Sequence, residues 1–133
     1  NGKQEMVGSE SGKVISGIQS AMLESHAKNL SLNILKTEGK NIQIGYRSAS
    51  TSKNSENLMA LVQKHASSQV SAGENAGKAL RHVQVVRELQ SQTLKPKNSF
   101  FFKLPDSNIA WEIIAFEQDR KSGEILDASN IKL

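Results

Sequence analysis

The sequence predicts a mainly β protein, an immunoglobulin-like antiparallel β-sandwich preceded by one N-terminal α-helix. Two observations lead to this prediction. Apolar residues recur with a period near four up to residue 29 and with a period of two after it, which separates a helix from strands. Turn-forming residues then recur at the short spacing of a sandwich, with seven or eight short strands between them. We therefore expect two units, residues 1–29 and residues 30–133.

The helical segment spans residues 8–29. Ser9 is the expected N-cap, with Glu10 in the first turn, and Asn29 is the expected end of the helix. Its apolar residues fall at the spacing of one helix face and form a stripe: Val14, Ile15, Ile18, Met22 and Leu23. Because an exposed apolar stripe needs a partner, we expect either the sandwich or a second copy of the chain to cover it.

Residues 30–46 predict a β-hairpin with one buried face. Leu30, Leu32 and Ile34 alternate with polar residues before a turn at residues 38–41, and Ile42, Ile44 and Tyr46 alternate after it. A polar loop follows. Residues 57–66 are expected to form a strand, although a segment of this length is also compatible with a short helix.

Three extended runs close the chain, at residues 98–105, 110–119 and 123–133. Pro, Asn, Asp and Gly separate them, and these residues favour turns. We expect the last two runs to pair as a hairpin. The run Phe100–Phe102 is expected to join Trp111 in the core, with one Phe pointing outward.

Composition excludes several classes of function. The chain has 133 residues, of which 37% are hydrophobic and 23% charged, as in a soluble globular domain. The absence of cysteine removes disulfides, thiolate nucleophiles and the common structural zinc sites. The net charge of +4 is dispersed and the aromatics are few, which argues against nucleic acid as a partner. No apolar run reaches the roughly 20 residues that a membrane span requires.

The candidate site is the segment "SAGENAGKALRHVQVVREL" at residues 71–89. Gly73 and Gly77 predict a tight turn with a positive φ. From Arg81 onward the side chains alternate, which predicts a strand, and a helix over residues 74–90 is the alternative. The candidate binding residues are Glu74, Asn75, Arg81, His82 and Arg87.

Two interpretations of these residues are open. In the first, Glu74 and His82 form a proton-transfer pair and Arg87 binds an anion. In the second, which we favour, the segment is a structural corner that buries Glu74, Asn75 and Arg87. Glu74 and Asn75 would bond loop amides, and Arg87 would form an ion pair across strands. No activated nucleophile and no second carboxylate at a motif spacing accompany these residues, so we predict no catalytic residue and no cofactor.

Two further sets of residues do not have the spacing of a phosphate-binding loop or of a metal site. The stretch "GSESGK" at residues 8–13 lacks the spacing and the hydroxyl of a phosphate-binding loop. The three histidines, His26, His65 and His82, lie far apart in the sequence. We therefore predict no metal site.

Three segments together resemble one bacterial family, the domain of unknown function 1223 family. "SAGENAGKALRHVQVVREL" is similar to its G-E-N-x-G-x-x-L-x-H-x-x-V-V-R signature. "NGKQEMVGSESGKVISGIQSA" resembles its "V-N-G-x-x-x-x-V-G-S" hairpin and helix, and "WEIIAFEQDRKSGEILDAS" resembles its closing hairpin. The three matches occur in order between residue 1 and about residue 129.

The resemblance implies an exported protein with a thioredoxin-like half that carries a C-x-x-C pair. Neither that pair nor the cis-proline segment occurs here, and the chain does not begin with Met. We therefore expect residues 1–29 to be the last hairpin strand and helix of a thioredoxin-like domain, in a mature form or a piece of a longer protein. The expected partners are the missing half, another protein, or a second copy bound through the helix. The expected location is periplasmic or secreted, and the expected role is non-catalytic; the alternative is an independent ligand-binding module that uses the segment from Glu74 to Arg87.

Overall fold

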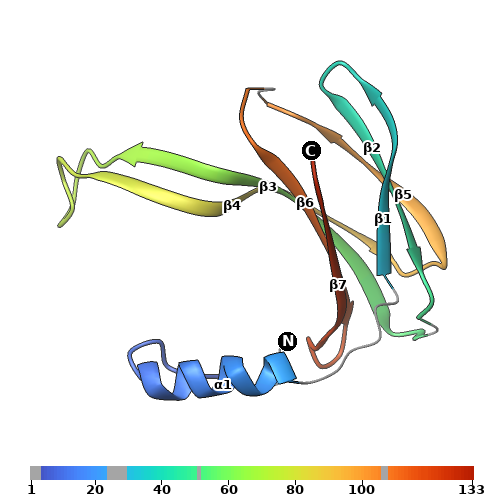
Figure 1. The fold of residues 1–133 in the computed structure, drawn as a ribbon, viewed down its shortest axis with the longest axis horizontal. Coiled ribbons are helices and arrows are strands. Elements are labelled where there is room, and N and C mark those ends of the chain that lie inside the picture. Colours follow the sequence, from blue (N-terminus) through green and yellow to red (C-terminus); the bar gives the residue numbers. More distant parts are fainter. Residues whose placement is uncertain (1–3, 24–29, 51, 106–107) are drawn as a thin grey trace.

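The computed structural model describes residues 4–23, 30–50, 52–105 and 108–133. One helix and seven strands are present in these residues (Figure 1). They are α1 (Ser11–Leu23), β1 (Leu30–Glu38), β2 (Asn41–Ser48), β3 (Ser55–Gln69), β4 (Ala79–Thr93), β5 (Lys97–Lys103), β6 (Trp111–Asp119) and β7 (Ile125–Lys132).

The strands form two antiparallel sheets. One sheet has the order β1-β2-β5 and the other has the order β4-β3-β6-β7. The chain crosses from the first sheet to the second after β2, returns after β4, and crosses again after β5. Such crossings are typical of Greek-key sandwiches of the immunoglobulin-like kind. The predicted β-sandwich with one N-terminal helix is therefore confirmed.

The hydrophobic core lies between the two sheets. Phe100 and Phe102 point into it, while Phe101 is 66% exposed on the outer face, as the alternation of side chains in a strand requires. The expectation that one phenylalanine of this run points outward is confirmed. The buried core residues are Leu30, Ile42, Ile44, Tyr46, Met59, Leu61, Phe100, Phe102, Trp111, Ile113 and Ala115.

The first hairpin is confirmed over β1 and β2, with a turn at Gly39 and Lys40 and a positive φ at Gly39. The prediction that Ile34 is buried is wrong, because its side chain is exposed. A register shift next to it leaves Leu35 without a paired residue. Such a bulge bends an edge strand away from the layer that would cover it.

Helix α1 buries none of its residues. Of the predicted stripe, Val14 is half-buried, while Ile15, Ile18, Met22 and Leu23 are all exposed. The sandwich therefore does not cover the stripe in this structure, and the helix stands beside it (Figure 1).

The cap of α1 differs from the predicted one by a single residue. The first helical hydrogen bond runs from the amide of Val14 to the carbonyl of Glu10, at 3.1 Å. Glu10 therefore occupies the cap position, where Ser9 was expected, and its carboxylate accepts a 2.9 Å bond from Lys13 Nζ. The predicted helix end at Asn29 lies outside the described residues.

The longest feature is a two-stranded arm. β3 pairs with β6 from Ser55 to Gln63, but its pairing with β4 continues to Gln69. Beyond Gln63 these two strands leave the sandwich as a hairpin (Figure 1). The strand predicted from Arg81 is thus confirmed, and so is the strand over residues 57–66; the helical alternatives for both segments are wrong.

Two irregularities lie where the arm leaves the sandwich. The register between β3 and β4 shifts at Leu61 and Val62, so that Arg87 is an extra residue in β4. Gln84 has a φ of 54°, in the left-handed region. Bulges of this kind increase the twist and bend of a strand, and they account for the change of direction.

Candidate functional site

The tip of the arm is a backbone-bonded turn between β3 and β4. The amide of Val70 donates to the carbonyl of Lys78 at 3.0 Å, and the amide of Gly77 donates to the carbonyl of Val70 at 2.8 Å. Gly73 and Gly77 have φ values of 82° and 80°. The predicted positive φ in this turn is confirmed, and it favours residues without a β-carbon.

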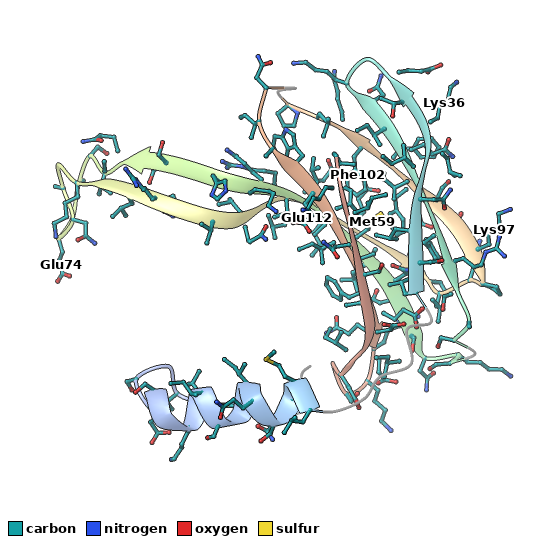
Figure 2. The ribbon with its side chains drawn as sticks, in the orientation of Figure 1. Lys36, Met59, Glu74, Lys97, Phe102 and Glu112 are labelled. Atoms are coloured by element: carbon teal, nitrogen blue, oxygen red, sulfur yellow. The ribbon has the colours of Figure 1, made fainter. Side chains whose placement is uncertain are left out.

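Glu74 and Asn75 are exposed at the tip, so the expectation that they are buried in a corner is wrong. Figure 2 shows Glu74 projecting from the far end of the arm. Asn75 Oδ1 accepts a bond of 3.1 Å from Lys78 Nζ on the surface. The backbone of the turn, rather than these side chains, carries its internal hydrogen bonds.

The structure does not bring Glu74 and His82 together. His82 lies within β4, where it pairs with Ala66, and its Nε2 lies 2.8 Å from Ser68 Oγ on the neighbouring strand. Glu74 lies in the turn that precedes β4. The hypothesis of a proton-transfer pair therefore lacks the geometry that it needs.

Arg87 makes a contact across the strands, but to a neutral group. Its Nε donates to Gln63 Oε1 at 2.8 Å, and its side chain is exposed. The expectation of a buried ion pair is therefore wrong. The bulge leaves Arg87 without a paired residue, and its side chain reaches Gln63, which pairs with Val85.

A groove runs along the root of the arm and combines residues from three segments. It has a volume of about 560 Å³. Arg81 and His82 belong to the predicted set, whereas His65 and Ile109 were not predicted, because nothing in their local sequence marks them. The lining residues are Gln63, His65, Ala66, Ser67, Arg81, His82, Val83 and Ile109.

A polar clasp, formed by Glu112, Asn130, Lys64 and Gln84, joins the arm to the sheet. Glu112 of β6 is only 4% exposed, and its Oε1 accepts a hydrogen bond from Asn130 Nδ2 of β7. Lys64 Nζ of β3 lies 3.5 Å from its Oε2. The hydrogen bond from Asn130, aided by Lys64 and Gln84, lowers the pKa of Glu112, although burial opposes this. Figure 2 labels Glu112 at the root of the arm.

The outer face of the β4-β3-β6-β7 sheet is apolar. Val62 pairs with Val86, and Ala60 pairs with both Leu89 and Ile114, so these residues lie on the face opposite the core. Only Val86 and Leu89 of this face are exposed, each to 54%, whereas Ala60 and Val62 are buried and Leu58, Ile114 and Phe116 are half-buried. The residues of this outer face are Leu58, Ala60, Val62, Val86, Leu89, Ile114 and Phe116.

The described residues contain no group of three or more His, Asp or Glu placed to bind a metal ion. Within the same residues, no helix is long and apolar enough to cross a membrane. The candidate features are the tip, the groove, the clasp and the apolar outer face.

Comparison with known proteins identifies a family. The sequence family described as "Protein of unknown function (DUF1223)" matches residues 1–116. A search of the curated proteins finds no match. Among solved structures, the crystal structure of Bacteroides uniformis beta-glucuronidase is similar with a TM-score of 0.28 and 13% identity, over 83% of this chain. The chain spans only 13% of that enzyme.

Proposed function

We propose that this chain, which belongs to the DUF1223 family, is a non-catalytic β-sandwich module that holds another protein domain in place. The supporting observation is a pair of uncovered apolar surfaces. One is the stripe of α1, and the other is the exposed part of the outer face of the four-stranded sheet, at Val86 and Leu89. Contiguous exposed apolar surface on a soluble protein commonly marks a site of protein contact.

The two surfaces are suited to one partner. α1 and the arm extend from the same side of the sandwich with open space between them (Figure 1). Val86 and Leu89 continue the apolar outer face toward the arm. A globular domain seated there would cover sheet and helix together, and burial of each large apolar side chain contributes roughly 1.5–3 kcal/mol.

The proposed partner is a thioredoxin-like domain that precedes this chain in the intact protein, in a periplasmic or secreted setting. The three motif resemblances support this part of the proposal. The chain has no thiol of its own, so any thiol chemistry would belong to the partner and this module would position it.

Association between two separately purified polypeptides tests the proposal. The full chain is titrated with the region encoded upstream of it, and binding is followed by calorimetry. Ile18→Glu and Leu89→Glu should each weaken association at least tenfold, because each places a charge within the apolar contact. Phe101→Glu is the matched control, since Phe101 is exposed on the other sheet. Equal affinity for Leu89→Glu and the unaltered chain would contradict the proposal.

The second candidate function is an independent ligand-binding module that uses the segment from Glu74 to Arg87. The groove favours it, because Arg81 and His82 both line this cavity. Glu74 and Asn75 lie at the tip and do not contribute to the groove.

A further inference from the structure

We propose that the groove at the root of the arm binds a ligand with one carboxylate group and an apolar body. This inference rests on the second candidate function, the ligand-binding module. It concerns a site separate from the apolar outer face, so it stands or falls independently of domain docking.

The first step is the arrangement of four side chains. Arg81 pairs with Ser67 and Val83 pairs with His65, and the two pairs are two residues apart along each strand. Paired residues share a face, and residues two apart in a strand do as well. Arg81, Ser67, Val83 and His65 therefore form one patch, with hydrogen-bonding groups next to an apolar one.

The second step is charge. None of the residues that line the groove is acidic. Arg81 has a neutral residue opposite it, and within the described residues no ion pair to its guanidinium is observed. Arg87 bonds Gln63 nearby but does not itself line the groove. A donor-rich surface with one unneutralised cation favours an anion.

The third step selects the kind of anion. A guanidinium fork matches the two oxygens of a carboxylate. Arg81 is the one formal cation among the lining residues, and a single charge is better matched to a monoanion than to a phosphate dianion. Val83 is exposed, and Ile109 is half-buried beside it. These two residues provide an apolar surface for the rest of the ligand.

The carboxylate could belong to a free organic acid or to the C-terminus of a peptide. Amide NMR of the full chain separates these sources with two pairs of probes. Benzoate is compared with benzamide, and a tetrapeptide that ends in Phe is compared with its C-terminal amide. We expect benzoate to shift the amides of residues 63–67 and 81–83, and benzamide to shift them at least fivefold more weakly. If the peptide acid binds more tightly than benzoate, the ligand is a peptide terminus; if benzoate binds more tightly, it is a free acid.

Arg81→Gln should weaken benzoate binding at least fivefold, whereas Arg120→Gln, a change of another exposed arginine, should leave it unaltered. Equal shifts by benzoate and benzamide, or an unaltered affinity in Arg81→Gln, would overturn the carboxylate assignment while leaving a ligand-binding groove. If no probe shifts these amides, both the inference and the second candidate function fail.

Discussion

Among single residues, Gln84 carries a backbone conformation that its side chain does not favour. Its φ of 54° lies in the left-handed region, which costs a residue with a β-carbon roughly 1–2 kcal/mol. We expect Gln84→Gly to be more stable than Gln84→Ala by about 1 kcal/mol. Both variants lose the side-chain amide of Gln84, so their difference isolates the backbone. At an unstrained position in a strand, the Ala variant is more stable than the Gly variant. If urea unfolding shows that order at position 84 as well, the backbone of Gln84 is not strained.

Glu112 should make stability depend on pH. Its pKa is lowered, first by the hydrogen bond from Asn130, so the carboxylate stabilises the fold above its ordinary pKa and loses this effect as the pH falls through the lowered one. Glu112→Gln should cost about 1–3 kcal/mol near neutral pH, as expected for hydrogen bonds to a charged group.

The difference in unfolding free energy between Glu112→Gln and the unaltered chain should shrink as the pH falls from about 6 to about 3. Urea titrations at several pH values measure this difference. Glu88→Gln is a suitable control, because Glu88 is exposed on β4 of the same sheet. A constant difference across this range would show that the charge of Glu112 does not contribute.

Arg87 should matter less to stability than the sequence suggested. A buried ion pair would have cost roughly 3–5 kcal/mol to break, but Arg87 is exposed and bonds a neutral amide. We now expect Arg87→Ala to cost about 0.5–1.5 kcal/mol in urea unfolding, the usual contribution of one hydrogen bond. A loss above about 3 kcal/mol would restore the ion-pair interpretation.

At the scale of elements, the arm should be dispensable for folding. None of the buried core residues comes from β4 or from the part of β3 beyond Gln63. Replacing residues 67–81 by Asn-Gly would join the paired residues Ala66 and His82 through a two-residue turn. We expect the shortened chain to keep its β-sheet circular dichroism and to melt within about 5 °C of the full chain, since a shift of that size corresponds to roughly 1 kcal/mol. Loss of cooperative melting would show that the arm supports the sandwich.

Local patterns identified most elements of this fold. The change of period after residue 29 separated the helix from the strands, and Gly39, Gly73 and Gly77 marked turns that do have positive φ values. The length of the arm could not be predicted in this way. Alternation shows that a segment is a strand, but it does not show where a neighbouring strand such as β6 stops pairing.

At the scale of the whole molecule, local sequence patterns likewise predicted only part of the candidate site. Arg81 and His82 were identified from their own segment, but His65 and Ile109 reach the groove through pairing and a crossover. The predicted burial of Glu74 failed because it assumed that a charged turn lies against the sandwich, whereas the arm carries it away. Distances between segments decide such sites, and a single sequence does not contain them.

Deletion of α1 should leave the β-sandwich folded. α1 buries none of its residues, and the buried core residues all lie between Leu30 and Ala115. We therefore expect a chain that lacks residues 1–23 to unfold in urea with the midpoint of the full chain. The full chain should bind more of a hydrophobic dye than the shortened one, because it alone exposes Ile15, Ile18 and Met22. Ile18→Glu in the full chain is the control, and it should reduce dye binding without moving the midpoint. If removal of α1 lowers the midpoint, the helix packs on the sandwich in solution, and the surface proposed to receive a second domain is already occupied.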